Sequence, residues 1–174
     1  MKVLFVCSGN AHRSPLAEAL LRKIRRDWVV DSAGVQVAVP IAEEIKEFLR
    51  RESAEEYLKR GSESLGGKRL GDFDVIVAME EGHRDYVLSL CPECGDRVFV
   101  WNVRDPYFMD RENAWKVYEQ IKEKVTELAS RCEVQKGHIS DCDSGSLVYK
   151  RYGYSKGLKR KVFSLSSVNY HFRV

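Results

Sequence analysis

A cysteine and an arginine lie six positions apart near the start of the chain, within the stretch FVCSGNAHRSPLAEALL at residues 5–21. Cys7 ends an apolar run, and five small or polar residues separate it from Arg13. An arginine can hold a tetrahedral oxyanion through two parallel N–H bonds. A thiol among such donors is favoured as the thiolate, which is the nucleophilic form. The pair therefore indicates attack by sulfur on a bound, phosphate-like anion.

This chemistry requires a strand, a tight loop and the start of a helix. The apolar run KVLFV at 2–6 predicts a buried strand, and Pro15 suits a first helical turn, where its missing N–H is not needed. The loop N–H groups and the helix N-terminus would together form an anion site. Gly9 is predicted to allow a backbone geometry that a side chain would block, and Asn10 to tolerate a left-handed conformation.

The same spacing of cysteine and arginine occurs a second time, from Cys91 to Arg97 in the segment CPECGDR. This match follows a predicted helix and precedes a predicted strand, so no helix N-terminus points at it. Glu93 and Asp96 would repel an anion there, and Pro92 lacks a donor N–H. We therefore predict that only the first match is a phosphate site.

Strands and helices are predicted to alternate along the chain. The apolar patterns predict strands at 2–6, 28–34, 74–79 and 96–103, and helices over 15–26, 41–49, 80–90 and 113–131. Such alternation is typical of an α/β fold, here a small parallel four-stranded sheet flanked by helices. Ligands of these sheets bind beyond the carboxyl ends of the strands, which is where Cys7 lies.

Composition indicates one globular body with an appended segment. The chain has 174 residues, of which 44% are apolar and 32% charged. Residues 1–135 carry 21 Lys and Arg against 24 Asp and Glu, whereas residues 136–174 carry 8 against 2. We interpret 1–135 as a catalytic domain and 136–174 as a basic C-terminal extension. The extension would suit an anionic partner, even nucleic acid, or it is an accessory hairpin or a terminal segment without a role.

The cysteines and the N-terminus bear on the compartment. The first apolar run is too short for a signal peptide, and no run approaches a membrane span. Five cysteines, an odd number, make a disulfide scaffold improbable and favour a cytoplasmic protein. The CPEC segment is half of a zinc site, a local redox pair or a helix end with two idle thiols. The residues that could complete a zinc site are Cys132, His138 and Cys142.

The stretch VCSGNAHRSPLAE resembles the signature loop of the low-molecular-weight protein tyrosine phosphatases, V-C-x-G-N-x-x-R-S-P-x-A-E. The resemblance extends to VDSAG at 30–34, FDVIVAM at 73–79 and DPYF at 105–108, and covers roughly residues 1–132 in family order. It implies a cofactor-free, metal-free phosphatase that acts through a phosphocysteine. Its substrate would be a phosphorylated protein or a small phosphate ester, and its oligomeric state stays open.

The resemblance also implies residue roles. Cys7 would take up the phosphoryl group, Arg13 would hold its equatorial oxygens, and Asp105 would be the general acid. The cradle around the phosphoryl group would consist of Ser8, Gly9, Asn10, Ala11, His12 and Arg13.

Four further residues would support this machinery. Ser14 would donate its hydroxyl to the thiolate and to the departing sulfur, and Ser32 would support Asn10. Pro106 would hold the loop of the general acid, and Tyr107 would line the mouth of the pocket.

Several positions depart from the family pattern and bear on the substrate. His12 stands where many relatives have a second loop cysteine, so a disulfide with Cys7 is impossible there. A protonated His12 could favour the thiolate, or the residue only fills the loop. Ala11 leaves a roomier wall, and VQVAVP at 35–40 lacks an aromatic wall. The family's histidine before the third strand has no match. Protein phosphotyrosine is the first prediction, with phosphoarginine or a small aryl or acyl phosphate as alternatives.

Two other functions fit the same loop. An arsenate reductase would need two more redox cysteines, one directly after the third strand, where this chain has AMEEG; Cys91 and Cys94 come later and together. A non-catalytic phosphate-binding module would require neither Cys7 nor Asp105. Turnover of p-nitrophenyl phosphate distinguishes the three.

Overall fold

The computed structural model describes residues 1–131, which form a four-stranded sheet in the order β2–β1–β3–β4 with every neighbouring pair parallel. The strands are β1 (Lys2–Cys7), β2 (Val29–Gly34), β3 (Val75–Ala78) and β4 (Val98–Val100). The α-helices are α1 (Arg13–Ile24), α2 (Glu43–Arg51), α3 (Glu81–Leu90) and α4 (Arg111–Arg131). The predicted α/β class and parallel sheet are confirmed, and the extension at 136–174 lies outside the described residues.

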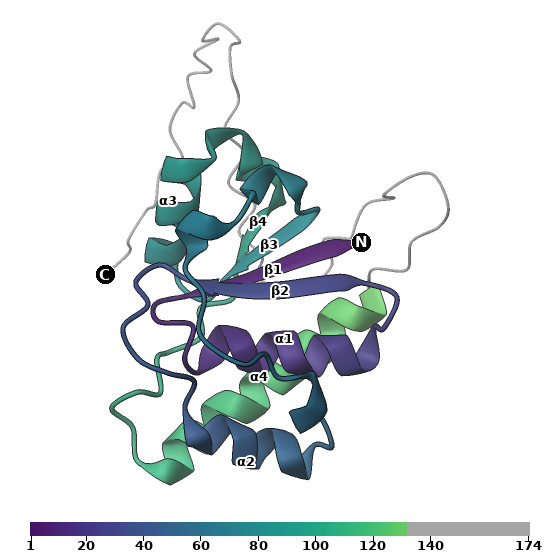
Figure 1. The fold of residues 1–174 in the computed structure, drawn as a ribbon, viewed down its shortest axis with the longest axis vertical. Coiled ribbons are helices and arrows are strands. Elements are labelled where there is room, and N and C mark those ends of the chain that lie inside the picture. Colours follow the sequence, from purple (N-terminus) through teal and green to yellow (C-terminus); the bar gives the residue numbers. More distant parts are fainter. Residues whose placement is uncertain (132–174) are drawn as a thin grey trace, which may run out of the picture.

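The central strand β1 is buried on both faces. Val3, Phe5 and Cys7 point into the larger apolar cluster, whereas Leu4 and Val6 point into a second cluster. Figure 1 shows α1, α2 and α4 below the sheet and α3 above it. Because successive side chains of a strand face opposite sides, one apolar run fills both layers.

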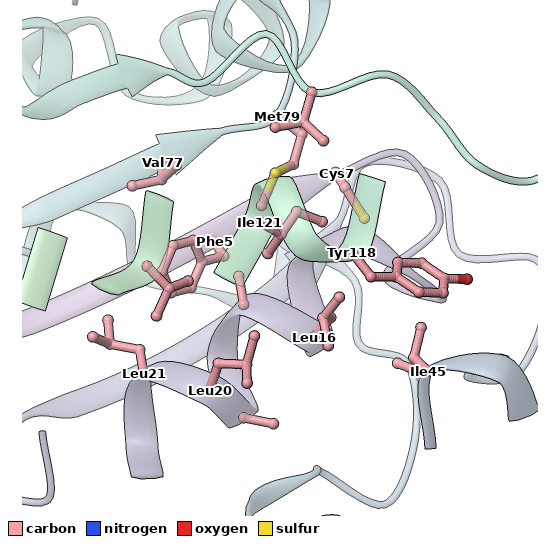
Figure 2. Packing of buried hydrophobic residues seen from close by; sticks show 14 of the residues in the cluster. Phe5, Cys7, Leu16, Leu20, Leu21, Ile45, Val77, Met79, Tyr118 and Ile121 are labelled. Carbon is pink, nitrogen blue, oxygen red and sulfur yellow. The ribbon is translucent and has the colours of Figure 1, made fainter. Parts of the chain in front are cut away.

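Helix α4 covers the larger cluster with one apolar face. Tyr118, Ile121 and Val125 are buried on it, at the spacing that the sequence predicts. Figure 2 shows Tyr118 and Ile121 in the same cluster as Cys7. None of the helices within residues 1–131 is long and apolar enough to cross a membrane.

Strand β4 is shorter than predicted. The sequence predicts a strand over 96–103, but residues Pro92–Arg97 form a 3₁₀ helix, and the strand ends at Val100. Beyond it, Trp101 N–H and Val103 N–H still donate to Ala78 and Met79 carbonyls, at 2.9 and 2.8 Å. These two bonds hold the chain in place as it runs toward Asp105.

Three further 3₁₀ helices lie in the connections, at η1 (Glu55–Tyr57), η2 (Leu65–Gly67) and η3 (Leu70–Asp72). The sequence predicts a loop around the last two, and η1 was not predicted. Helix α4 begins at Arg111, two residues earlier than predicted, because Asp110 Oδ1 accepts the Asn113 N–H at 3.0 Å.

The register brings the carboxyl ends of the strands to one edge. Cys7 pairs with Gly34, Val6 with Ala78, and Ala78 with Val100. The segments that follow all four strands therefore start side by side. The N-termini of α1 and α3 begin at this edge, where parallel sheets bind ligands.

Candidate active site

The loop between β1 and α1 turns its carbonyl groups outward. Cys7 and Ser8 carbonyls accept from Val35 and Gln36 N–H at 3.0 and 2.8 Å, and the Ala11 carbonyl accepts from a further N–H at 2.9 Å. The N–H groups of the loop can then point inward, as the Asn10 N–H does toward Cys7. Asn10 has a φ of 53°, the left-handed conformation that the sequence predicts for it.

The sulfur of Cys7 lies inside this loop. It is 2% exposed and free, 2.9 Å from Ser14 Oγ and 3.2 Å from the Asn10 N–H that donates to it. Asn10 Nδ2 also donates to Ser14 Oγ at 2.9 Å. Because Ser14 Oγ accepts that bond, its own proton can point to the sulfur. Two donors thus face the atom proposed to be the nucleophile.

Asn10 is held from behind by buried polar groups. Its Nδ2 donates to Ser32 Oγ at 2.8 Å, and its Oδ1 accepts the Glu63 N–H at 2.8 Å. Ser32 Oγ donates in turn to Glu18 Oε2 at 2.6 Å. The sequence predicts the Ser32 contact, but Glu18 and Glu63 were missed.

A buried ion pair lies beneath this support. Glu18 is 1% exposed at its side chain and lies 3.4 Å from Lys59 Nζ, which also contacts Asp31 at 3.0 Å. Burial raises the pKa of Glu18, while Lys59 and the Ser32 hydrogen bond act in the opposite direction. No sequence pattern joins these residues, since they come from α1, β2 and the connection that follows η1.

Arg13 is almost fully buried, and its guanidinium contacts the loop, the start of α3 and the segment after β4. Nη1 donates to the Val103 carbonyl at 2.9 Å and lies 3.1 Å from Glu80 Oε1. Nη2 donates to Ser8 Oγ at 3.0 Å and to Asp105 Oδ2. Two carboxylates therefore neutralise a guanidinium that is 1% exposed. A bound phosphate dianion would face the same positive charge of the Arg13 guanidinium.

Asp105 lies across the site from the loop. Its side chain is 41% exposed, and Oδ1 accepts the Tyr107 N–H at 3.1 Å. Pro106 is buried, and its carbonyl accepts a backbone N–H at 2.9 Å, which closes the turn. The Tyr107 ring is 52% exposed and meets His12 edge-on, with centroids 5.8 Å apart. The structure thus brings Asp105, Tyr107 and His12 to the mouth of one site.

The surroundings of His12 favour its neutral form. Burial lowers its pKa, and this outweighs the opposite effect of Asp105 and Glu44. A protonated His12 that supports the thiolate is therefore not expected. The other hypothesis, that His12 fills the loop, agrees with its ring contact to Tyr107.

Two functional candidates at the start of α3 were missed. Glu80 contacts Arg13, and His83 Nε2 lies 2.9 Å from Ser8 Oγ. Burial and then Arg13 lower the pKa of His83. The segment MEEGH directly follows the third predicted strand. The rule that ligands bind at strand ends could have found both residues.

The prediction that a side chain at Gly9 would block the backbone geometry is wrong. Within the protein, a Cβ at this position would lie 3.8 Å from the Gln36 carbonyl oxygen, an ordinary contact. Gly34 is the glycine that the loop requires. A Cβ there would lie 2.8 Å from Asn10 N, 2.8 Å from Gly9 C and 2.9 Å from Ser8 O. The loop between β1 and α1, hereafter the phosphate loop, packs directly on the backbone of β2 at this point.

The CPEC segment forms a local disulfide between Cys91 and Cys94, with Cα atoms 5.4 Å apart. The hypothesis of two idle thiols is therefore wrong, and sulfurs joined to one another cannot ligate zinc. Cys132, His138 and Cys142 lie outside the described residues. Arg97 donates to the Gly71 and Phe73 carbonyls, at 3.0 and 2.9 Å, so its guanidinium faces no anion loop.

The geometry can support one kind of reaction. A buried thiol, a guanidinium and a carboxyl group converge on the N-terminus of α1, with one N–H and one hydroxyl group beside the sulfur. This arrangement fits phosphoryl transfer to sulfur, in which the protein mainly positions groups and stabilises charge. Fold and site thus define a class: α/β proteins built for cysteine-dependent phosphoryl transfer.

Comparison with known proteins places the chain within that class. The model of the low molecular weight phosphotyrosine protein phosphatase family matches residues 2–138, and the chain belongs to this family. Wzb of Salmonella typhi, a low molecular weight protein-tyrosine-phosphatase, is 27% identical over 148 residues, 78% of this chain and 97% of Wzb. The protein-arginine-phosphatase of Geobacillus stearothermophilus is 27% identical over 145 residues, 77% and 97% of the two chains.

Solved structures of the family share the fold. The low molecular weight protein tyrosine phosphatase from T. tengcongensis has a TM-score of 0.69 and 31% identity, and the match covers 76% of this chain and 99% of that one. A cysteine-to-serine mutant of YwlE arginine phosphatase, with a phosphorylated active-site serine, has a TM-score of 0.67 and 26% identity, with 75% and 94% covered.

Proposed function

We propose that this phosphatase hydrolyses phosphotyrosine in proteins through a phosphocysteine on Cys7. The observation that carries the proposal is the convergence of Cys7, Arg13 and Asp105. Cys7 Sγ faces two hydrogen-bond donors, and the guanidinium of Arg13 donates to the carboxylate of Asp105. A nucleophile, an anion-binding group and a proton donor thus share one edge of the sheet.

In the first step, the Cys7 thiolate attacks phosphorus while Arg13 and the loop N–H groups hold the phosphoryl oxygens. The S–P bond forms and the bond from phosphorus to the tyrosine oxygen breaks. The Asp105 carboxyl group gives its proton to that oxygen, so a neutral phenol leaves. The phosphate dianion would compete with Asp105 for the guanidinium of Arg13.

In the second step, the Asp105 carboxylate accepts a proton from a water molecule that attacks phosphorus. The P–O bond to water forms, the S–P bond breaks, and inorganic phosphate leaves. The sulfur departs as a thiolate, and the Ser14 hydroxyl at 2.9 Å stabilises it. The phosphorylated serine in the YwlE mutant supports a phosphoryl group at the nucleophile position.

A phosphorylated arginine is the second candidate, and the acidic mouth favours it. Glu44, Glu80 and Asp105 all lie close enough to act on the histidines of the site. Carboxylates recognise a guanidinium through paired hydrogen bonds. Against this, the exposed Tyr107 ring offers a flat apolar surface to a tyrosine ring. Relatives with each substrate name match the chain at 27% identity.

The test is a panel of phosphorylated substrates compared by kcat/KM. It contains p-nitrophenyl phosphate and one peptide sequence phosphorylated on tyrosine, arginine or serine. The proposal expects turnover of p-nitrophenyl phosphate and the highest kcat/KM on phosphotyrosine. A higher value on phosphoarginine would instead favour the second candidate. Cys7→Ser is the matched control and should bind phosphate without turning over any substrate.

Two outcomes would contradict phosphatase activity altogether. Binding of phosphate without turnover of any substrate by wild type would indicate a non-catalytic module. Thiol-dependent reduction of arsenate without phosphoester hydrolysis would indicate an arsenate reductase. The second outcome is not expected, since Met79–Glu81 after β3 contains no cysteine. The first is not expected, since binding alone would require neither Cys7 nor Asp105.

A further inference from the structure

His83 is a buried titratable side chain that the mechanism above does not use. It lies in the first turn of α3 and is 7% exposed. Its Nε2 atom is 2.9 Å from Ser8 Oγ and 3.8 Å from Glu80 Oε2. Ser8 Oγ also accepts a hydrogen bond of 3.0 Å from Arg13 Nη2. A single hydroxyl group thus links α3 to the guanidinium of the site.

The surroundings of the two ring nitrogens decide which of them carries the proton. Nδ1 is buried and has no hydrogen-bond partner among the residues that the structure describes. A buried N–H without an acceptor is rare and costly. Nε2, in contrast, faces a hydroxyl oxygen and, farther away, a carboxylate oxygen, and both can accept. A neutral His83 therefore carries its proton on Nε2 and donates it to Ser8 Oγ.

This direction of the bond determines what the Ser8 hydroxyl can do. A serine hydroxyl has one proton to donate and two lone pairs that accept. Arg13 Nη2 and His83 Nε2 then occupy both lone pairs, and the Ser8 proton stays free. With the other tautomer, the Ser8 proton would be given to His83 and would be lost to a ligand.

We propose that His83 is a positioning residue that keeps the Ser8 proton free for a phosphoryl oxygen bound on Arg13, which makes the Ser8 side chain a further phosphate donor. The inference rests on the proposed function, because it adds a donor to the same site. It differs from a purely structural role of His83, since it requires an N–H at one position of the side chain and not merely a filled space.

The test measures the Kd of inorganic phosphate by titration calorimetry in the full-length chain. Ser8→Ala removes the proposed donor, and His83→Leu removes the group that frees its proton. His83→Gln places an amide N–H near the Nε2 position, whereas His83→Asn reaches only the Nδ1 position. Ser89→Ala, a hydroxyl removed from the exposed part of α3, is the matched control.

We expect Ser8→Ala and His83→Leu to weaken phosphate binding by about 10- to 100-fold each, as for a hydrogen bond to a charged group. Because both act through one proton, the double variant should bind no more weakly than Ser8→Ala alone. His83→Gln should restore binding toward wild type, and His83→Asn should not. Ser89→Ala should bind phosphate as wild type does.

Losses that multiply in the double variant would overturn the proposal. So would a His83→Gln variant that melts like wild type but binds phosphate as weakly as His83→Leu. If His83→Leu does not fold, Ser8→Ala decides, and unchanged phosphate affinity in it would overturn the proposal. Phosphate binding needs no turnover. A wild-type protein that binds phosphate but hydrolyses nothing would therefore contradict the proposed function and leave this test intact.

Discussion

At the scale of single residues, the contact between Asp105 and Arg13 joins the proposed general acid to the anion-binding group. Asp105 is part-exposed, whereas Arg13 is buried and also contacts Glu80. A guanidinium without a partner would be costly at such a depth. We interpret the two carboxylates as partners that hold Arg13 until a phosphate dianion arrives. Binding of the dianion would then free Asp105 to act on the leaving group.

The role of Asp105 as a general acid predicts a dependence on the leaving group. Tyrosine, with a pKa of about 10, leaves poorly without a proton, whereas nitrophenol leaves well. Asp105→Asn should therefore lower phosphotyrosine turnover on the order of 10²–10⁴-fold. The loss should be much smaller for formation of the phosphoenzyme from activated aryl phosphates. The measurement is the rate of phosphoryl transfer against leaving-group pKa, for both enzymes.

Phosphate affinity is the control for this comparison, because Asp105→Asn removes a negative charge and should not weaken anion binding. A steeper dependence on leaving-group pKa in the variant would support the assignment. Equal slopes for the two enzymes would remove Asp105 from the mechanism and leave the DPYF segment as a turn.

At the scale of elements, the phosphate loop between β1 and α1 packs on β2 with no room for a side chain at Gly34. Gly34 ends β2 beside Cys7, and a Cβ on it would meet the backbone of residues 8–10 at 2.8–2.9 Å. Backbone atoms cannot move aside as a flexible side chain can. The geometry of the loop therefore depends on a glycine in a neighbouring strand.

Gly34→Ala should displace the phosphate loop. We expect the free energy of unfolding to fall on the order of 1–3 kcal/mol, as for overpacking. The value of kcat/KM should also fall, because the displaced loop carries Cys7 and Arg13. Gly71→Ala is the matched control, since a Cβ there meets no atom within 4 Å, and it should change stability by less than about 0.5 kcal/mol. Urea unfolding and steady-state kinetics measure both. Wild-type kcat/KM in Gly34→Ala would show that the loop does not depend on this contact.

Local patterns predicted most of the elements, and contacts between distant segments account for what was missed. The run at 2–6 and the helical spacing after Pro15 predicted β1 and α1, since apolar periodicity and helix starts are local signals. The clustering of Cys7, Arg13 and Asp105 was expected from the family resemblance. Glu18 and Lys59 meet only in the folded protein. A sequence pattern does not show which buried charges will pair.

His83, at the N-terminus of α3, is expected to make the free energy of unfolding depend on pH. Burial and Arg13 lower the pKa of His83 below its usual 6.5, against the effect of Glu80 and Asp105. A folded-state pKa below the unfolded value means that stability is full above pH 6.5 and is lost as pH falls through the folded pKa. His83→Gln cannot titrate. The free energy of unfolding of wild type, relative to this variant, should be constant above pH 6.5 and decline below it.

Urea unfolding of both proteins at a series of pH values gives this difference directly. The half-buried His12 is present in both proteins, so its titration cancels in the comparison. A difference that stays flat from neutral pH down to about pH 5 would show that burial does not disfavour the charged imidazole.

At the scale of the whole molecule, every site contact described above comes from residues 1–131. The two apolar clusters fill both faces of the sheet, and α4 completes the larger one. We therefore propose that the chain up to the end of α4 is a complete catalytic unit. Residues 136–174 would then be an accessory segment, as their basic charge suggests.

Truncation after Cys132 tests this division. We expect the shortened protein to fold and to keep the kcat/KM of the full chain on p-nitrophenyl phosphate. Truncation after Glu123 is the control and should destabilise the protein, because it removes the buried Val125 and Ala129. A folded Cys132 truncation without activity would show that the extension contributes to the site.

The central claim is that the phosphoryl group passes through the sulfur of Cys7, and trapping it there is the most direct measurement. Wild type and Asp105→Asn are mixed with an aryl phosphate, quenched rapidly into denaturant, digested and analysed by mass spectrometry. We predict one added phosphoryl group on the peptide that contains Cys7 during turnover, with none on the peptide of Cys91 and Cys94 and none in Cys7→Ala. Turnover with Cys7 unmodified at every quench time, or a phosphoryl group on another residue, would contradict the account.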